Sequence, residues 1–364
     1  MEKMKEIDEI IDKNKHIIDL YNKNKTKKRL FIVILIPLVI LLVGLSIDFG
    51  SADIRFFDVY KTVFNKIFPF VNSDISANHV EVIIWKIRLP RIIMGVLTGI
   101  TLGSTGAVMQ VVLKNPLADP YMLGISSAAG FGASLAIVFG VGFFAGEYLI
   151  IGNAFIFSII SAGLILLISS MKNSTPGTMV LTGLALMFFF QAMTTIIQYF
   201  GNSEAVKSAV FWTVGDLGKA DWSKIKIATP LVFVGEILLI YKSGDLNVMN
   251  TGDASAKSLG INVQGTRIFT MFVSSIMVAG IVSFTGTIGF IGLVAPHIVR
   301  MIVGNDNRIL VPASGLVGAV LLVLADTVAR TIISPVILPV GSVTAFLGVP
   351  LFVYLILKGK AGSV

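Results

Sequence analysis

The sequence has 364 residues, of which 55% are apolar and 14% charged, and its mean hydropathy is +0.87. Soluble globular domains carry about 25% charged residues, so this composition excludes an ordinary soluble protein. Apolar runs of about 20 residues recur from residue 30 onward, and this length predicts membrane-spanning helices. These runs do not alternate polar and apolar residues, which argues against a transmembrane β-barrel.

Charge and residue usage exclude several other classes. The net charge is +8, which we expect to face anionic lipid rather than nucleic acid. The absence of cysteine excludes disulfides and thiolate metal sites. His16, His79 and His297 lie far apart in the sequence and do not suggest a metal site. The phosphate-binding loop motif GxxxxGK[ST] does not occur, so this chain is not expected to bind nucleotide by such a loop.

The N-terminal segment, residues 1–29, is polar and holds nine of the 29 Lys and Arg residues. It lacks the apolar core of a signal peptide. Positive charge accumulates on the cytoplasmic side of membrane proteins, so we expect a cytoplasmic tail at 1–29 followed by a membrane domain at 30–360.

Ten apolar segments follow the tail. An even number returns the C-terminus to the cytoplasmic side, although the later loops show no cytoplasmic excess of positive charge. We therefore predict an all-α polytopic membrane protein with about ten transmembrane helices and both termini in the cytoplasm. The predicted segments are 30–48, 88–111, 122–142, 148–170, 178–200, 225–242, 268–285, 288–303, 309–330 and 341–358.

Three arginines fall at the outer ends of predicted helices. Arg88 and Arg91 bracket a proline in RLPR, and Arg330 ends a later segment. From topology alone, these side chains either bind lipid phosphates or extend to the membrane surface, or they are retained on the outside for a function. Asp326 precedes Arg330 by four residues, which places both on one helix face and predicts an ion pair that holds Arg330 in position.

Other residues inside the predicted segments are open to more than one interpretation. Gly95, Gly99 and Gly103 are spaced four apart and predict a close helix–helix contact. Glu236 is the one carboxylate deep within an apolar run. It is either part of an ion-coupled carrier or paired with a neighbouring helix. The glycine-broken stretch 286–292 is either a pathway element or a tight turn.

Four long stretches resemble the FecCD/BtuC-type permeases, the membrane subunits of ABC importers for iron–siderophores, haem and vitamin B12. The resemblance covers about residues 30–360. The stretches are RLPRIIMGVLTGITLGSTGAVMQVVLKNPLADPYMLGISSAAG (88–130), TGDASAKSLGI (251–261), GTIGFIGLVAPHIVRMIVGNDNRILVPASGLVGAVLLVLADTVAR (286–330) and LPVGSVTAFLGVPLFVYLILK (338–358).

The resemblance implies a transporter subunit without an ATPase site of its own. Two permease subunits, identical or homologous, would form the pathway, each on a partner ATPase that binds ATP and Mg. This chain would then hold no cofactor. An extracytoplasmic binding protein would deliver the substrate, for which we expect an iron–siderophore, with haem and vitamin B12 as alternatives. The expected location is the bacterial cytoplasmic membrane.

The resemblance also implies roles for particular residues. Within the polar loop 243–267, for which the sequence predicts two short helices, the ATPase-coupling residues would be Gly252, Asp253, Ala256, Leu259 and Gly260. The residues that dock the binding protein would be Arg88, Arg91 and Arg330. The expected cytoplasmic gate is Ser174, Thr175, Pro176 and Gly177, and the expected pathway residues are Met109, Gln110, Asn115 and Pro116.

Overall fold

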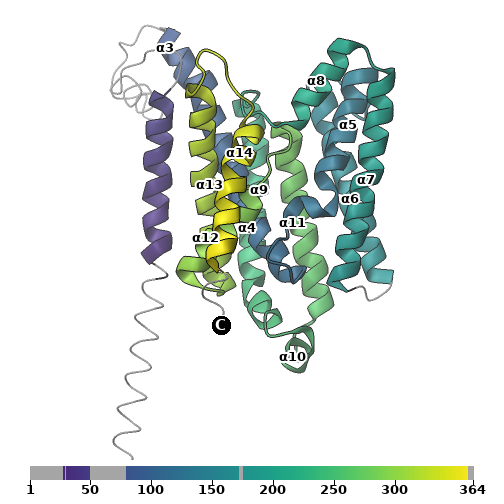
Figure 1. The fold of residues 1–364 in the computed structure, drawn as a ribbon, viewed down its shortest axis with the longest axis vertical. Helices are drawn as coiled ribbons and strands as arrows, with labels where there is room; N and C mark the ends of the chain where they lie inside the picture. The colour runs from purple at the N-terminus through teal and green to yellow at the C-terminus, as the bar shows by residue number, and fades with distance from the viewer. Residues whose placement is uncertain (1–27, 29, 50–78, 172–174, 360–364) are drawn as a thin grey trace, which may run out of the picture.

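The computed structural model describes residues 28, 30–49, 79–171 and 175–359. Over these ranges the chain is helical, with no β-strand (Figure 1). The predicted tail lies outside the described residues except for Lys28. This architecture confirms the predicted all-α polytopic class.

Ten described helices correspond to the ten predicted segments. Six stretches in the described part of the chain, including η1 joined to α4, are long and apolar enough to cross a membrane. The ten are the N-terminal helix Leu30–Asp48, α4 (Leu89–Val112), α5 (Ile125–Phe139), α6 (Tyr148–Met171), α7 (Pro176–Phe200), α9 (Trp222–Met249), α11 (Val263–Thr285), α12 (Ile291–Val303), α13 (Asn307–Thr331) and α14 (Val340–Gly359).

Short helices complete the described chain. A π-helical turn, η1 (Ile83–Arg88), follows α3 (His79–Val82) and leads into α4. A 3-10 turn, η2 (Pro120–Leu123), precedes α5. The remaining two are α8 (Ser203–Thr213) and α10 (Asp253–Ser258).

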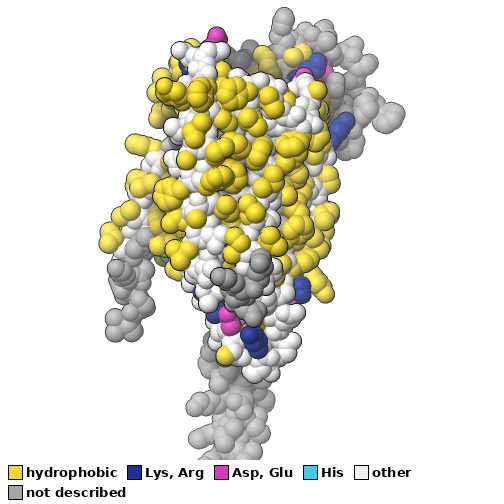
Figure 2. Space-filling model, turned by 90° about the vertical axis from the view of Figure 1, so that its right-hand side faces the viewer, with side chains coloured by type: hydrophobic (Ala, Val, Ile, Leu, Met, Phe, Trp, Pro, Cys, Tyr) yellow, Lys and Arg dark blue, Asp and Glu magenta, His cyan; other side chains and the backbone are white. Residues whose placement is uncertain are grey.

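The bundle has two distinct ends. In Figure 1, α10 lies at one end, together with the start of the N-terminal helix and the end of α14, whereas α3 and α8 lie at the other. Figure 2 shows a broad apolar face between these ends, with charged side chains gathered towards them. This arrangement suits a bundle whose middle faces lipid. We call the two ends the α10 end and the α8 end.

Helix α4 lies at the centre of the bundle because its small residues admit neighbouring backbones. A Cβ atom added at Gly103 would lie 2.0 Å from the Ser314 carbonyl oxygen of α13. One added at Gly106 would lie 1.9 Å from the Gly292 carbonyl oxygen of α12. The predicted close contact is therefore confirmed, and it extends along α4 to a second neighbour.

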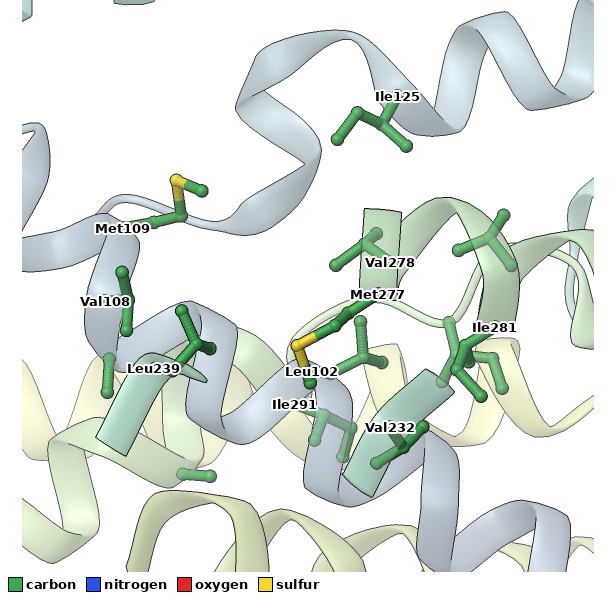
Figure 3. Packing of buried hydrophobic residues seen from close by; sticks show 14 of the residues in the cluster. Leu102, Val108, Met109, Ile125, Val232, Leu239, Met277, Val278, Ile281 and Ile291 are labelled. Atoms are coloured by element: carbon green, nitrogen blue, oxygen red, sulfur yellow. The ribbon is translucent and has the colours of Figure 1, made fainter. Parts of the chain in front are cut away.

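Large apolar side chains fill the space around these contacts. Leu102 and Met109 of α4, Leu239 of α9 and Met277 of α11 belong to one buried cluster (Figure 3), and all are fully or almost fully buried. Helices separated by more than 100 residues in sequence therefore share one core.

The loop predicted at 243–267 is shorter than expected. Helix α9 continues to Met249, seven residues beyond the predicted end, and α11 already begins at Val263. The polar residues after position 242 are compatible with helix, and the first backbone break is Gly252, whose φ is +109°. The prediction of two short helices is wrong, because only α10 forms between α9 and α11.

Candidate functional site

At the α8 end, a buried carboxylate joins two of the predicted arginines. Arg91 Nη2 lies 2.8 Å from Asp326 Oδ1, and Arg330 Nε lies 2.9 Å from Asp326 Oδ2. Asp326 is 1% exposed. The predicted Asp326–Arg330 pair is confirmed, and Arg91 from α4 completes a three-residue cluster between α4 and α13.

Two of the arginines also cap the C-terminal end of the N-terminal helix. Arg88 Nη1 donates to the Ile47 carbonyl at 2.6 Å, and Arg330 Nη2 donates to the carbonyl and hydroxyl of Ser46 at 3.0 and 2.8 Å. The last carbonyls of a helix have no partner within the helix and carry partial negative charge. Two guanidinium groups supply the missing donors, which fastens this helix to α4 and α13.

All three arginines that were predicted to dock the binding protein are buried in the single chain. Arg88 and Arg91 are 6% exposed and Arg330 is 7% exposed. The sequence indicated the Arg330 partner through its helical spacing, but Arg91 and Asp326 are 235 positions apart and share no local pattern. Docking of a binding protein at these residues stays a prediction, and it would require surface that the single chain covers.

At the α10 end, Asp253 connects three elements. Its carboxylate accepts from Arg267 Nη2 of α11 at 3.1 and 3.2 Å and lies 2.9 Å from Lys114 Nζ, just beyond α4. Partial burial acts to raise the pKa of Asp253, but the hydrogen bonds and positive charges of Lys114 and Arg267 outweigh it, so the pKa lies below the ordinary value. Helix α10 is thereby tied to both α4 and α11.

The other predicted coupling residues divide into exposed and buried groups. Leu259 is 68% exposed, and Gly260 next to it has a φ of +83° with open space where a Cβ would lie. Gly252 and Gly260 provide the left-handed backbone on either side of α10. Ala256 is fully buried, so it packs into the core of the protein and is not part of an exposed contact surface.

Replacing Asp253 with asparagine is expected to loosen α10. The lost ion pairs are partly exposed, so we expect a cost of about 1 kcal/mol and about fivefold faster amide exchange in α10. Because the folded pKa is lowered, the stabilisation is present at neutral pH and disappears as the pH falls through that pKa. Hydrogen exchange measured by mass spectrometry tests this. Asp221→Asn, at the cap of α9 on the opposite end, is the control and should leave α10 protection unchanged.

Part of the predicted gate begins a helix. Thr175 accepts from the Thr178 amide at 3.3 Å as the N-cap of α7, and Pro176 occupies the first helical position. These are the residue types that favour a helix start. Ser174 lies outside the described residues. Gly177 is exposed in the first turn of α7. The gate assignment stays a prediction.

The predicted pathway residues separate in the structure. Met109 is fully buried in the apolar core of the single chain (Figure 3), and its assignment to the pathway stays a prediction. Gln110, Asn115 and Pro116 instead line a pocket of about 310 Å³ at the α10 end, together with Arg300. Arg300 was not among the predicted site residues, although it lies within the quoted stretch 286–330.

Glu236 faces α4 from the middle of α9. Ser104 of α4 lies beside its side chain, and the Ser104 hydroxyl donates to the Ile100 carbonyl at 2.8 Å. Its second oxygen, Oε2, is buried without a hydrogen-bond partner in the described part of the chain. The interpretation as a residue paired with a neighbouring helix stays a prediction.

The sequence is similar to those of known membrane transport proteins. The FecCD transport family matches residues 38–358. A protein of Methanocaldococcus jannaschii assigned as an ABC transporter permease, MJ0087, is 44% identical over 82% of this chain and 88% of its own length. The hemin transport system permease HmuU of Yersinia pestis is 36% identical, over 90% of this chain and 95% of its own.

The structural comparison extends the same relationship. An inward-facing conformation of a protein classed as a metal-chelate type ABC transporter superposes with a TM-score of 0.77 at 29% identity, over 90% of this chain and 98% of its own. Such permeases work with separate ATPase subunits and a binding protein. The chain therefore belongs to the FecCD transport family, as a multi-pass ABC importer permease subunit that has no ATPase site of its own.

Proposed function

We propose that this permease imports an iron chelate, with an iron–siderophore as the first candidate. The relatives include permeases named for hemin, for cobalamin and for Fe(3+)-citrate, so the substrate class is a large chelate in each case. Haem and vitamin B12 are the alternatives within this class. An ion-coupled carrier that works alone does not fit a chain of this family.

The observation that carries the proposed mechanism is the linkage of α10. Its exposed Leu259 offers an apolar contact to a partner, and Asp253 connects the same helix to Lys114 beyond α4 and to Arg267 of α11. A partner ATPase that binds ATP and Mg would shift α10, and the Asp253 contacts would pass this movement to the bundle. A second permease subunit, identical or homologous, would complete the pathway.

Uptake by cells that lack this gene tests the substrate. The panel comprises iron as several siderophore complexes, iron citrate, haem and cobalamin, with the wild-type gene restored from a plasmid. We expect rescue for one iron–siderophore complex. Rescue by haem or cobalamin alone would replace the iron–siderophore assignment, and ATP-independent uptake would contradict the importer mechanism.

Leu259→Asp tests the contact with the ATPase. Placing a charge on this exposed apolar side chain should reduce co-purification of the ATPase at least about tenfold, because an unpaired carboxylate is costly to bury in an interface. Lys207→Glu on α8 is a matched control, because Lys207 is an exposed side chain at the opposite end. Full ATPase recovery with Leu259→Asp would exclude Leu259 as a principal contact.

A further inference from the structure

A polar pocket of about 310 Å³ opens at the α10 end, where α4 and α12 end and α13 begins. None of the residues that line it is acidic. Its polar lining consists of Gln110, Lys114, Asn115, Asn250, Arg300 and Asn305.

Arg300 is a half-buried cation with a neutral partner. Its Nη2 donates to Gln110 Oε1 at 2.7 Å. Within the described part of the chain, Arg300 forms no ion pair with a carboxylate. A guanidinium group withdrawn from water is costly unless an anion or several acceptors compensate it. The remaining donors of Arg300 therefore favour a bound anion.

Gln110 supplies a second, independent indication. The residue is 4% exposed, and its Oε1 is already used by Arg300, which fixes the orientation of the amide. Its Nε2 is buried and lacks an acceptor among the described residues. A buried amide donor of this kind is normally satisfied. Gln110 also lines the pocket, so an acceptor bound there would satisfy it.

Lys114 places a further positive charge at the pocket. Its φ is +50°, and the Asn115 amide donates back to the Gln110 carbonyl at 3.1 Å, a helix ending in which glycine is the usual residue. Lys114 shares the single carboxylate of Asp253 with Arg267. Lys114, Arg267 and Arg300 therefore carry three positive charges, against the one negative charge of Asp253.

We propose that this pocket binds a phosphate group, either on an anionic phospholipid or free in solution. An arginine fork, an ammonium group and amide donors match the several acceptor oxygens of phosphate. Met301 and Ile302, next to Arg300, are 52% and 57% exposed, so apolar surface adjoins the cation as it does where proteins meet lipid headgroups. Neither the substrate nor the binding protein enters this inference, so it stands apart from the proposed function.

The test measures thermal unfolding of the purified full-length protein in neutral detergent. Short-chain phosphatidylglycerol and inorganic phosphate are titrated separately, and diacylglycerol of the same chain length controls for the acyl chains. We expect a saturable rise in the melting temperature with at least one phosphate compound and none with diacylglycerol. A response to phosphatidylglycerol alone identifies a lipid headgroup as the source, and a response to inorganic phosphate identifies a soluble ligand.

Two variants assign the effect to this pocket. Arg300→Gln removes the fork, and Asn305→Asp adds a negative charge at an exposed position, where we expect folding to be preserved. Each should weaken the apparent affinity at least about tenfold. Arg308→Gln is the matched control, an exposed arginine at the same end that does not line the pocket. The proposal is wrong if no phosphate compound raises the melting temperature, or if both pocket variants bind as the wild type does.

Discussion

Asp326→Asn is expected to destabilise the protein by about 3–5 kcal/mol, because it leaves two buried guanidinium groups without their shared counter-ion. Arg91 and Arg330 approach the two oxygens of this carboxylate at 2.8 and 2.9 Å. Asparagine keeps the size of the side chain but removes the charge and one acceptor. Thermal unfolding of the purified variant in detergent measures the loss directly.

The consequence should reach the N-terminal helix. Asp326 orients Arg330, and Arg330 donates to Ser46 and Phe49 at the end of that helix. We therefore expect faster amide exchange in Leu30–Asp48 than in α11 of the same variant. Asp245→Asn is the control, since Asp245 forms a partly exposed pair with Lys242 that is worth about 0–1 kcal/mol. Equal stability of the two variants would contradict a counter-ion role for Asp326.

This cluster also changes how substitutions of Arg88 and Arg91 are interpreted. Loss of uptake after charge reversal would follow from a disrupted helix end as well as from lost docking. A docking role is therefore tested by binding-protein affinity in variants whose melting temperature is unchanged. The exposed lysines of the same end, Lys86 and Lys207, are the appropriate comparison.

The sequence predicted those features of the fold that depend on local pattern. Apolar runs located the ten described helices that match the predicted segments, and glycine spacing located the α4 contact, because both signals lie within a single helix. The Asp326–Arg330 pair was predictable for the same reason, since residues four apart share a helix face.

Features that depend on distant segments were not predictable in this way. Arg91 meets Asp326, and Lys114 meets Asp253, across more than 100 residues. Met109 and Gln110 are neighbours in one motif, yet the first lies in the core and the second faces the pocket, because successive helical residues point in different directions. The predicted end of α9 was seven residues too early. Polar residues alone do not end a helix, and here the first non-helical backbone conformation is at Gly252.

Gly106→Ala is expected to cost about 3 kcal/mol although it adds a single methyl group. That methyl carbon would lie 1.9 Å from the Gly292 carbonyl oxygen, a backbone atom of α12 that cannot rotate away. The two helices must therefore separate. Gly163→Ala is the matched control, since Gly163 is an exposed position of α6 with open space around its Cβ. Alanine there should be neutral or stabilise by up to about 1 kcal/mol, because it favours helix.

Separation of α4 and α12 should also change the geometry of the pocket at the α10 end. Gln110 lies one helical turn after Gly106, and Arg300 lies two turns after Gly292, so the contact between the glycines sets the helix spacing at which Gln110 meets Arg300. Gly106→Ala should therefore lower both the melting temperature and phosphate binding, whereas Gly163→Ala should change neither by much. Unchanged stability in Gly106→Ala would mean that α4 and α12 are not held in direct backbone contact.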